Sequence, residues 1–103
     1  MTADESTLGG YTAVHARPPA FEGVDGLAYT VDIVVDDTGD TQAPVGAALL
    51  FVRWTGEQPT ARGHLETAFL ARGMDEGAVR AVVERLPLLD VKHALDTLIR
   101  AEG

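Results

Sequence analysis

The sequence predicts an α+β fold in two layers: a four-stranded antiparallel meander followed by two helices packed on one face of the sheet. Apolar and β-branched residues alternate in short runs over the first two-thirds of the chain, with Gly, Pro and Asp between the runs. The last quarter instead has apolar residues at helical spacing. A β-β-β-β-α-α order of this kind favours strands that pair with their neighbours in sequence.

The first strand is expected at residues 11–17. This stretch, YTAVHAR, is short and contains aromatic and β-branched residues, and it stops at Pro18, which cannot continue a central strand. Residues 1–9 are rich in Thr, Asp, Glu, Ser and Gly and are interpreted as a flexible tail. The rest of the chain, residues 10–103, is expected to form a single domain.

The second strand follows a connection at residues 18–26, which contains two prolines and two glycines. Residues 27–36 alternate between an apolar set that includes Tyr29 and Ile33 and a polar set that includes Thr30 and Asp32. This pattern is typical of a strand with one face buried.

The third strand, residues 45–54, is apolar on both faces. It is therefore expected to be central and covered on both sides. Its two alternating sets are Val45, Ala47, Leu49 and Phe51 on one side, and Ala48, Leu50, Val52 and Trp54 on the other.

The fourth strand is expected at residues 64–71, HLETAFLA, with a short helix as the alternative. Arg72 and Gly73 then provide a turn in either case. Asp75 is placed to cap a first helix, and Pro87 separates it from a second helix at residues 88–101. The apolar stripes are Val79, Val82, Val83 and Leu86 in the first helix, and Val91, Ala94, Leu95, Leu98 and Ile99 in the second.

Composition excludes several classes of function. The net charge is -8 and the acidic excess lies in residues 1–78, so binding to nucleic acid is not expected. The absence of cysteine excludes disulfides and thiolate metal sites. The longest apolar run, residues 47–52, is far shorter than the about 20 residues that span a bilayer. No membrane association is expected, and a cytoplasmic location is the default.

The third strand carries the main functional prediction. Two helices can cover one face of a four-stranded sheet, so one apolar set of this strand lacks a cover. We expect an interaction or oligomerisation domain, most simply a homodimer, with Leu50, Val52 and Trp54 at the interface. Two covers are open for this patch: the segment 18–26 folded across it, or a second protein chain.

The alternative is a small-ligand or metal-binding protein, conceivably a hydrolase. His64 and Glu66 lie two residues apart, so on a strand they share one face and could hold a metal with His15 or His93. A third hypothesis uses the edge of the strand at residues 11–17 to bind a partner's strand or helix. No cofactor is expected, because the sequence contains no phosphate-binding glycine motif.

Overall fold

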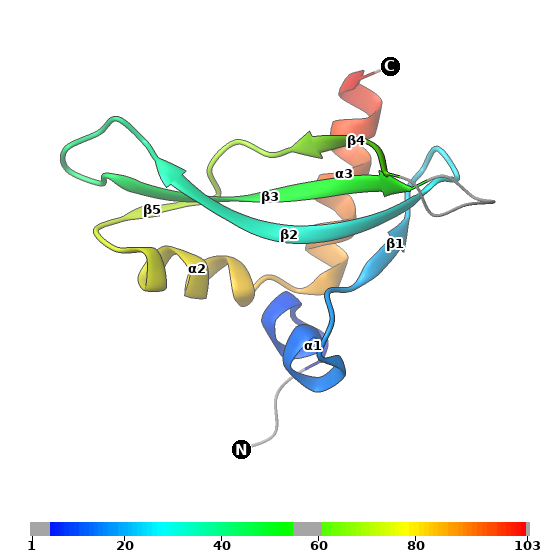
Figure 1. The fold of residues 1–103 in the computed structure, drawn as a ribbon, viewed down its shortest axis with the longest axis horizontal. Helices are drawn as coiled ribbons and strands as arrows, with labels where there is room; N and C mark the ends of the chain where they lie inside the picture. The colour runs from blue at the N-terminus through cyan, green and yellow to red at the C-terminus, as the bar shows by residue number, and fades with distance from the viewer. Residues whose placement is uncertain (1–4, 55–60, 103) are drawn as a thin grey trace.

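The architecture comes from a computed structural model, which describes residues 5–54 and 61–102. An antiparallel sheet carries helices on one face, and the helix α3 passes behind the strands in Figure 1. The α+β class and the antiparallel sheet followed by two helices are confirmed. The full element order is α-β-β-β-β-β-α-α, with a helix before the sheet and a fifth strand that the sequence analysis does not predict.

The centre of the sheet is a long hairpin of β2 (Ala28–Asp37) and β3 (Val45–Trp54). The two strands pair along their whole length, from Ala28 opposite Trp54 to Asp37 opposite Val45. β1 (Ala20–Glu22) pairs with β2, and β4 (Ala61–Glu66) and β5 (Ala71–Gly73) both pair with the other edge of β3. The predicted strands 27–36 and 45–54 are confirmed, and β3 is central as predicted.

The prediction of a strand at residues 11–17 is wrong, because this region lies in α1 (Leu8–His15). The Thr7 hydroxyl accepts a hydrogen bond from the Gly10 N–H and caps the helix, and Leu8 inserts into the core with only 3% of its surface exposed. Gly9 allows close packing on α2, since a Cβ at that position would lie 2.7 Å from Glu84 Cβ. Tertiary packing therefore overrides the β-branched composition.

Residues 7–9, which the sequence analysis placed in a tail, form the cap and first turn of this helix. The preceding backbone runs beside the link between the two C-terminal helices. Leu8 N–H donates to the Leu86 carbonyl, and Leu88 N–H donates to the Ser6 carbonyl. The segment before α1 is thus attached to the helical layer, while residues 1–4 lie outside the described residues.

The predicted fourth strand at residues 64–71 is replaced by two shorter ones with an excursion between them. β4 begins at Ala61, inside the predicted loop, and the chain leaves the strand conformation after Glu66. Thr67 keeps contact with β3: its N–H donates to the Leu49 carbonyl and its hydroxyl accepts from the Leu49 N–H. Leu70 N–H then donates to the Ala47 carbonyl, just before β5 begins.

The two C-terminal helices form as predicted. α2 (Glu76–Glu84) is capped by the Asp75 side chain, which accepts from the Ala78 N–H, and α3 (Leu88–Glu102) starts directly after Pro87. Their buried residues are Val79, Val83, Val91, Leu95 and Ile99. Val82, predicted on the apolar stripe, is 47% exposed. No helix in the described ranges has the length and apolar character needed to cross a membrane.

The core lies between this helical layer and the odd-numbered residues of the central strands. Tyr29, Leu49 and Phe51 are completely buried there, against Val83 and Leu95 of the helices. Even-numbered residues of the same strands point to the opposite side, because side chains alternate along a strand. We call the even-numbered side the open face.

Candidate interaction surface

The open face has an apolar centre on β3 and polar margins on the flanking strands. Leu50 lies between Asp32 of β2 and Glu66 of β4 in one cross-strand row. Val52 lies between Thr30 and His64 in the next row. Side chains in such rows are neighbours, because paired residues stand about 5 Å apart.

The three predicted interface residues all lie on this face. Leu50, Val52 and Trp54 are half-buried by their neighbours on the sheet, whereas Leu49 and Phe51 on the other side are fully buried. The Trp54 indole N–H donates a 2.9 Å hydrogen bond to the Thr30 hydroxyl, which holds the ring in place. Of the two alternating apolar sets of β3, the even-numbered one is therefore the set without a helical cover in the described residues.

One end of the open face is shaped by Phe69, which the sequence analysis does not single out. The ring lies directly over Gly46 of β3, where a Cβ would come within 2.5 Å of Phe69 Cδ1. Arg72 of β5 places its guanidinium 5.6 Å from the centre of the same ring. The signal in the sequence was the glycine inside an otherwise apolar strand, which marks a close approach by another group.

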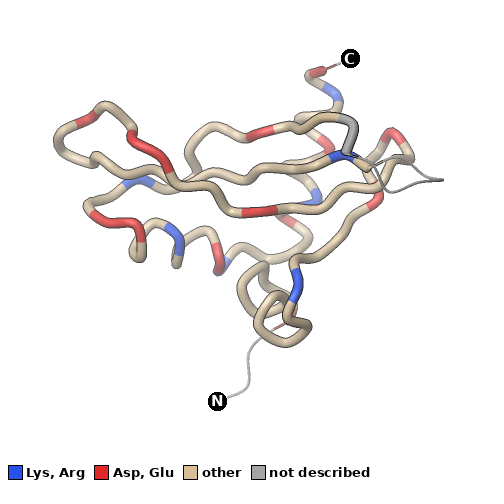
Figure 2. Tube along the Cα trace, in the orientation of Figure 1, with Lys and Arg blue, Asp and Glu red and all other residues tan. Residues whose placement is uncertain are grey.

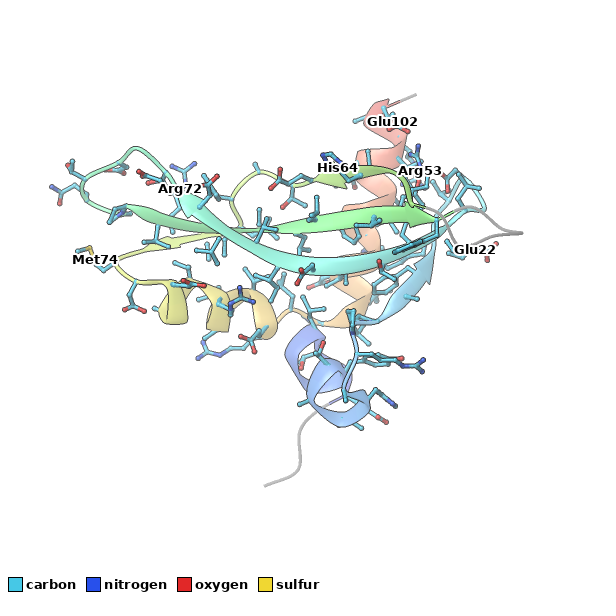
Figure 3. The ribbon with its side chains drawn as sticks, viewed as in Figure 1. Glu22, Arg53, His64, Arg72, Met74 and Glu102 are labelled. Carbon is cyan, nitrogen blue, oxygen red and sulfur yellow. The ribbon has the colours of Figure 1, made fainter. Side chains whose placement is uncertain are left out.

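His64 and Glu66 are exposed and lie on β4 beside the apolar centre. Figure 3 labels His64 on this strand. With Leu50, Val52 and Gly63 they line a hollow of about 500 Å³. The two separate predictions from the sequence, an apolar interface and a His–Glu pair, therefore describe one surface.

The structure brings no second histidine to His64. His15 is on α1, where it stacks on Tyr11 and lies 3.2 Å from Glu5, and His93 is exposed on α3. Over residues 5–54 and 61–102, no three His, Asp or Glu side chains are grouped closely enough to hold a metal ion. The two-histidine, one-carboxylate arrangement of the alternative hypothesis is not formed there.

The segment 18–26 does not cover the open face. Its first part forms β1 at the edge of the sheet, and its second part turns toward the helices, where the Val24 N–H donates to the Asp96 carboxylate of α3 at 2.9 Å. Of the two covers considered in the sequence analysis, the structure therefore rules out this one.

β1 pairs only with the first residues of β2, so the edge of β2 beyond Thr30 has no strand beside it in the described chain. Leu49 directs its N–H and carbonyl toward Thr67, so Ile33, opposite Leu49, directs its own groups outward from the sheet. The Ile33 N–H is taken up by the Asp32 carboxylate at 2.8 Å, and Asp36 accepts from the Asp37 N–H in the same way.

The covered face ends in a hydrogen-bonded polar chain. The Arg53 Nε donates to the Tyr29 hydroxyl at 2.7 Å, the hydroxyl donates to Asp25 at 2.6 Å, and a second Arg53 nitrogen donates to Glu102 of α3. Burial raises the pKa of Tyr29, and the bond to Asp25 raises it further. Burial opposes ionisation of Asp25, but its hydrogen bonds and the charge of Arg53 outweigh this effect, so its pKa is lowered. Each of these polar groups has a hydrogen-bond partner, so the network attaches α3 to the sheet.

A second hollow, of about 390 Å³, lies between α1, β2 and α2. Leu8, Thr12 and Ile33 contribute to its lining, with Arg80 and Glu84 at its polar side. Arg80 is directed to Glu76 at 3.8 Å, so the hollow lacks a converging set of polar groups. The open face is the stronger candidate for function.

No protein-family model, curated protein or solved structure matches this chain. Function is therefore inferred from the chemistry of the surface itself.

Proposed function

We propose that this protein is a non-catalytic interaction domain that binds a protein chain through the open face of its sheet. The observation that carries the proposal is the uneven cover of β3: α2 and α3 pack on its odd-numbered side, while Leu50, Val52 and Trp54 stay partly exposed on the other. Removing apolar surface from water contributes about 25 cal/mol per Å². A partner that packs on these three side chains would gain that contribution.

Binding is favoured over catalysis because of how the polar groups are held. Catalytic acids and bases are normally positioned by hydrogen bonds and shielded from water. His64 and Glu66 are exposed, and no other described residue forms a hydrogen bond or ion pair with either side chain. By contrast, the Trp54 ring is already fixed by Thr30, which lowers the entropy lost when a partner packs on it.

Site-specific photo-crosslinking tests the proposal. His64 is replaced by the photoreactive residue p-benzoylphenylalanine, and the matched control places the same residue at His93, exposed on α3 in the opposite layer. Irradiation in cells that naturally produce the protein is expected to give a discrete adduct from position 64 and none from position 93. Adducts from both positions, or from neither, would count against an interaction at the open face.

The mass of the purified chain in solution separates two kinds of partner. A second copy of the chain, the partner predicted from the sequence, would give twice the 10.9 kDa chain mass by light scattering. A mass of one chain at both low and molar salt would leave a different protein as the partner.

The hollow beside His64 and Glu66 supports one alternative function, a small-ligand or metal site. Thermal melts with and without zinc or nickel test it, since specific binding to the folded state raises the melting temperature. We expect no upward shift. A shift that His64→Ala abolishes would replace the interaction proposal with a metal-binding function.

A further inference from the structure

Leu50, Val52 and Trp54 form an apolar stripe on β3, and carboxylates border this stripe on both sides. Asp32 and Glu66 flank Leu50, and both are exposed. Farther along, Asp36 lies opposite Gly46, and Glu22 lies opposite Ala28 beside Trp54. Figure 2 shows the acidic positions on β2 and β4, on either side of the middle of β3.

Between the residues that the structure describes, no ion pair includes any of these carboxylates. The ion pairs between described residues join His15, Arg53, Arg80 and Lys92 to other acids, and none includes Asp32 or Glu66. The one cationic side chain described at this face's far end, Arg72, stacks on Phe69. The whole chain has a net charge of -8, so its background potential has the same sign.

This arrangement disfavours a second copy of the chain as the occupant. A two-fold interface brings the same patch of both molecules together. Each stripe would then meet another that carries the same two rows of carboxylates, and close like charges oppose such pairing. A partner with the opposite charge gains from both the stripe and its borders.

The width of the stripe indicates the shape of the partner. Strands in a sheet stand about 4.8 Å apart, so β2 and β4 lie about 10 Å from one another across β3. An α-helix with its side chains is about 10–12 Å wide. From Leu50 to Trp54 the strand extends about 13 Å, which matches about nine residues of helix.

We propose that the open face binds a basic amphipathic helix of another protein. Its apolar side packs on Leu50, Val52 and Trp54, and its Lys or Arg residues reach Asp32 on one border and Glu66 on the other. This inference rests on the proposed interaction function and adds the charge and form of the partner. Anchor residues at i, i+3 or i+4, and i+7 of the partner would lie along β3.

A pair of model peptides provides the test. One is a 14-residue amphipathic helix of Leu and Lys, and the other has Glu at every Lys position. Trp54 is the only tryptophan and lies on the proposed face, so its fluorescence reports binding to the full chain directly. We expect the Leu–Lys peptide to bind at least about tenfold more tightly than the Leu–Glu peptide, with an advantage that decreases at molar salt.

Charge-neutral variants localise the effect. Asp32→Asn with Glu66→Gln is expected to weaken binding of the Leu–Lys peptide about fivefold, as two rim ion pairs would. The matched control, Glu76→Gln with Asp90→Asn, makes the same change of charge in the first turns of α2 and α3. It should leave the affinity within about twofold. Circular dichroism and thermal melts confirm that all variants fold.

Each other outcome overturns a defined part of the argument. If the two double variants weaken binding of the Leu–Lys peptide equally, the attraction is a general one to an acidic protein. If the two peptides bind equally and Val52→Thr abolishes the binding of both, the face is apolar and has no charge selectivity. Either result overturns the basic-helix inference and leaves the interaction function standing, as does a dimer that excludes both peptides. Failure of both peptides, with no adduct from position 64, would overturn both proposals.

Discussion

The two faces of β3 have nearly the same composition but different surroundings. Leu49 and Phe51 are completely buried under α2 and α3, while Leu50 and Val52, their neighbours in sequence, stay partly exposed. The difference shows that apolar character on a strand establishes what a residue can pack against, and the rest of the fold decides whether anything does. On this protein, one face holds the molecule together and the other is available for binding.

Removing a side chain from each face gives the largest contrast. Phe51→Ala should lower the free energy of unfolding by about 3–5 kcal/mol, because it leaves a cavity in a fully packed core. Val52→Ala, one residue away, should lower it by about 1 kcal/mol or less, since its side chain is already partly exposed. Urea denaturation measures both values, and similar losses would mean that the open face is covered in solution.

At Phe69 the open face is closely packed, as the covered face is, because the ring lies directly over Gly46. Gly46→Ala should cost about 2 kcal/mol, because the new methyl group would overlap the ring and force it to move. In a Phe69→Ala background the same substitution should cost much less. A double-mutant cycle from urea denaturation measures this coupling, and a Gly46→Ala cost that does not depend on residue 69 would contradict the contact.

The polar end of the covered face should respond less strongly. Tyr29→Phe keeps the ring in the core but removes the hydroxyl that links Arg53 to Asp25. We expect a loss of about 1.5 kcal/mol, since two polar groups lose a partner. Thermal or urea unfolding checks this value, with Tyr11→Phe on the outside of α1 as a control that should change little.

The attachment of the helical layer to the β1–β2 connection predicts the smallest effect, a dependence on pH. The hydrogen bond from Lys92 lowers the pKa of Asp96; burial partly opposes this effect, and the Val24 N–H adds to it. Because the folded-state pKa is below the unfolded one, Asp96 contributes stability above the unfolded pKa. This contribution is lost as pH falls through the folded pKa.

The comparison with Asp96→Asn isolates that contribution. The variant should be less stable than the natural chain near neutral pH, and the difference should shrink as the solution is acidified toward pH 3. Urea denaturation at a series of pH values measures the difference. A gap that stays constant with pH would show that the carboxylate contributes through packing alone.

Much of the fold could be predicted from the sequence where one local signal dominates. β2 and β3 follow from alternation and turn residues, and α2 and α3 from helical spacing, the Asp75 cap and Pro87. α1 could not be predicted, because its formation depends on burial of Leu8 against helices about 75 residues away in sequence. The break between β4 and β5 likewise depends on Phe69 finding space over Gly46.

The candidate surface could be predicted only in part from the sequence. Alternation along β3 identifies Leu50, Val52 and Trp54 as one set, but Leu49 and Phe51 form an equally apolar set, and only the packing of the helices distinguishes the two. The acidic borders depend on register, which brings Asp32 and Glu66 to opposite sides of Leu50 from positions 34 residues apart. Local sequence carries no information about that pairing.

The free edge of β2 also bears on how this protein behaves at high concentration. Exposed strand edges are templates on which sheets grow from one molecule to the next. Here the outward N–H groups of Ile33 and Asp37 are already bonded to the carboxylates of the preceding residues. A strand adding at this edge must first displace two such bonds and approach two negative charges. These two N–H groups are thereby less available to a strand from another molecule.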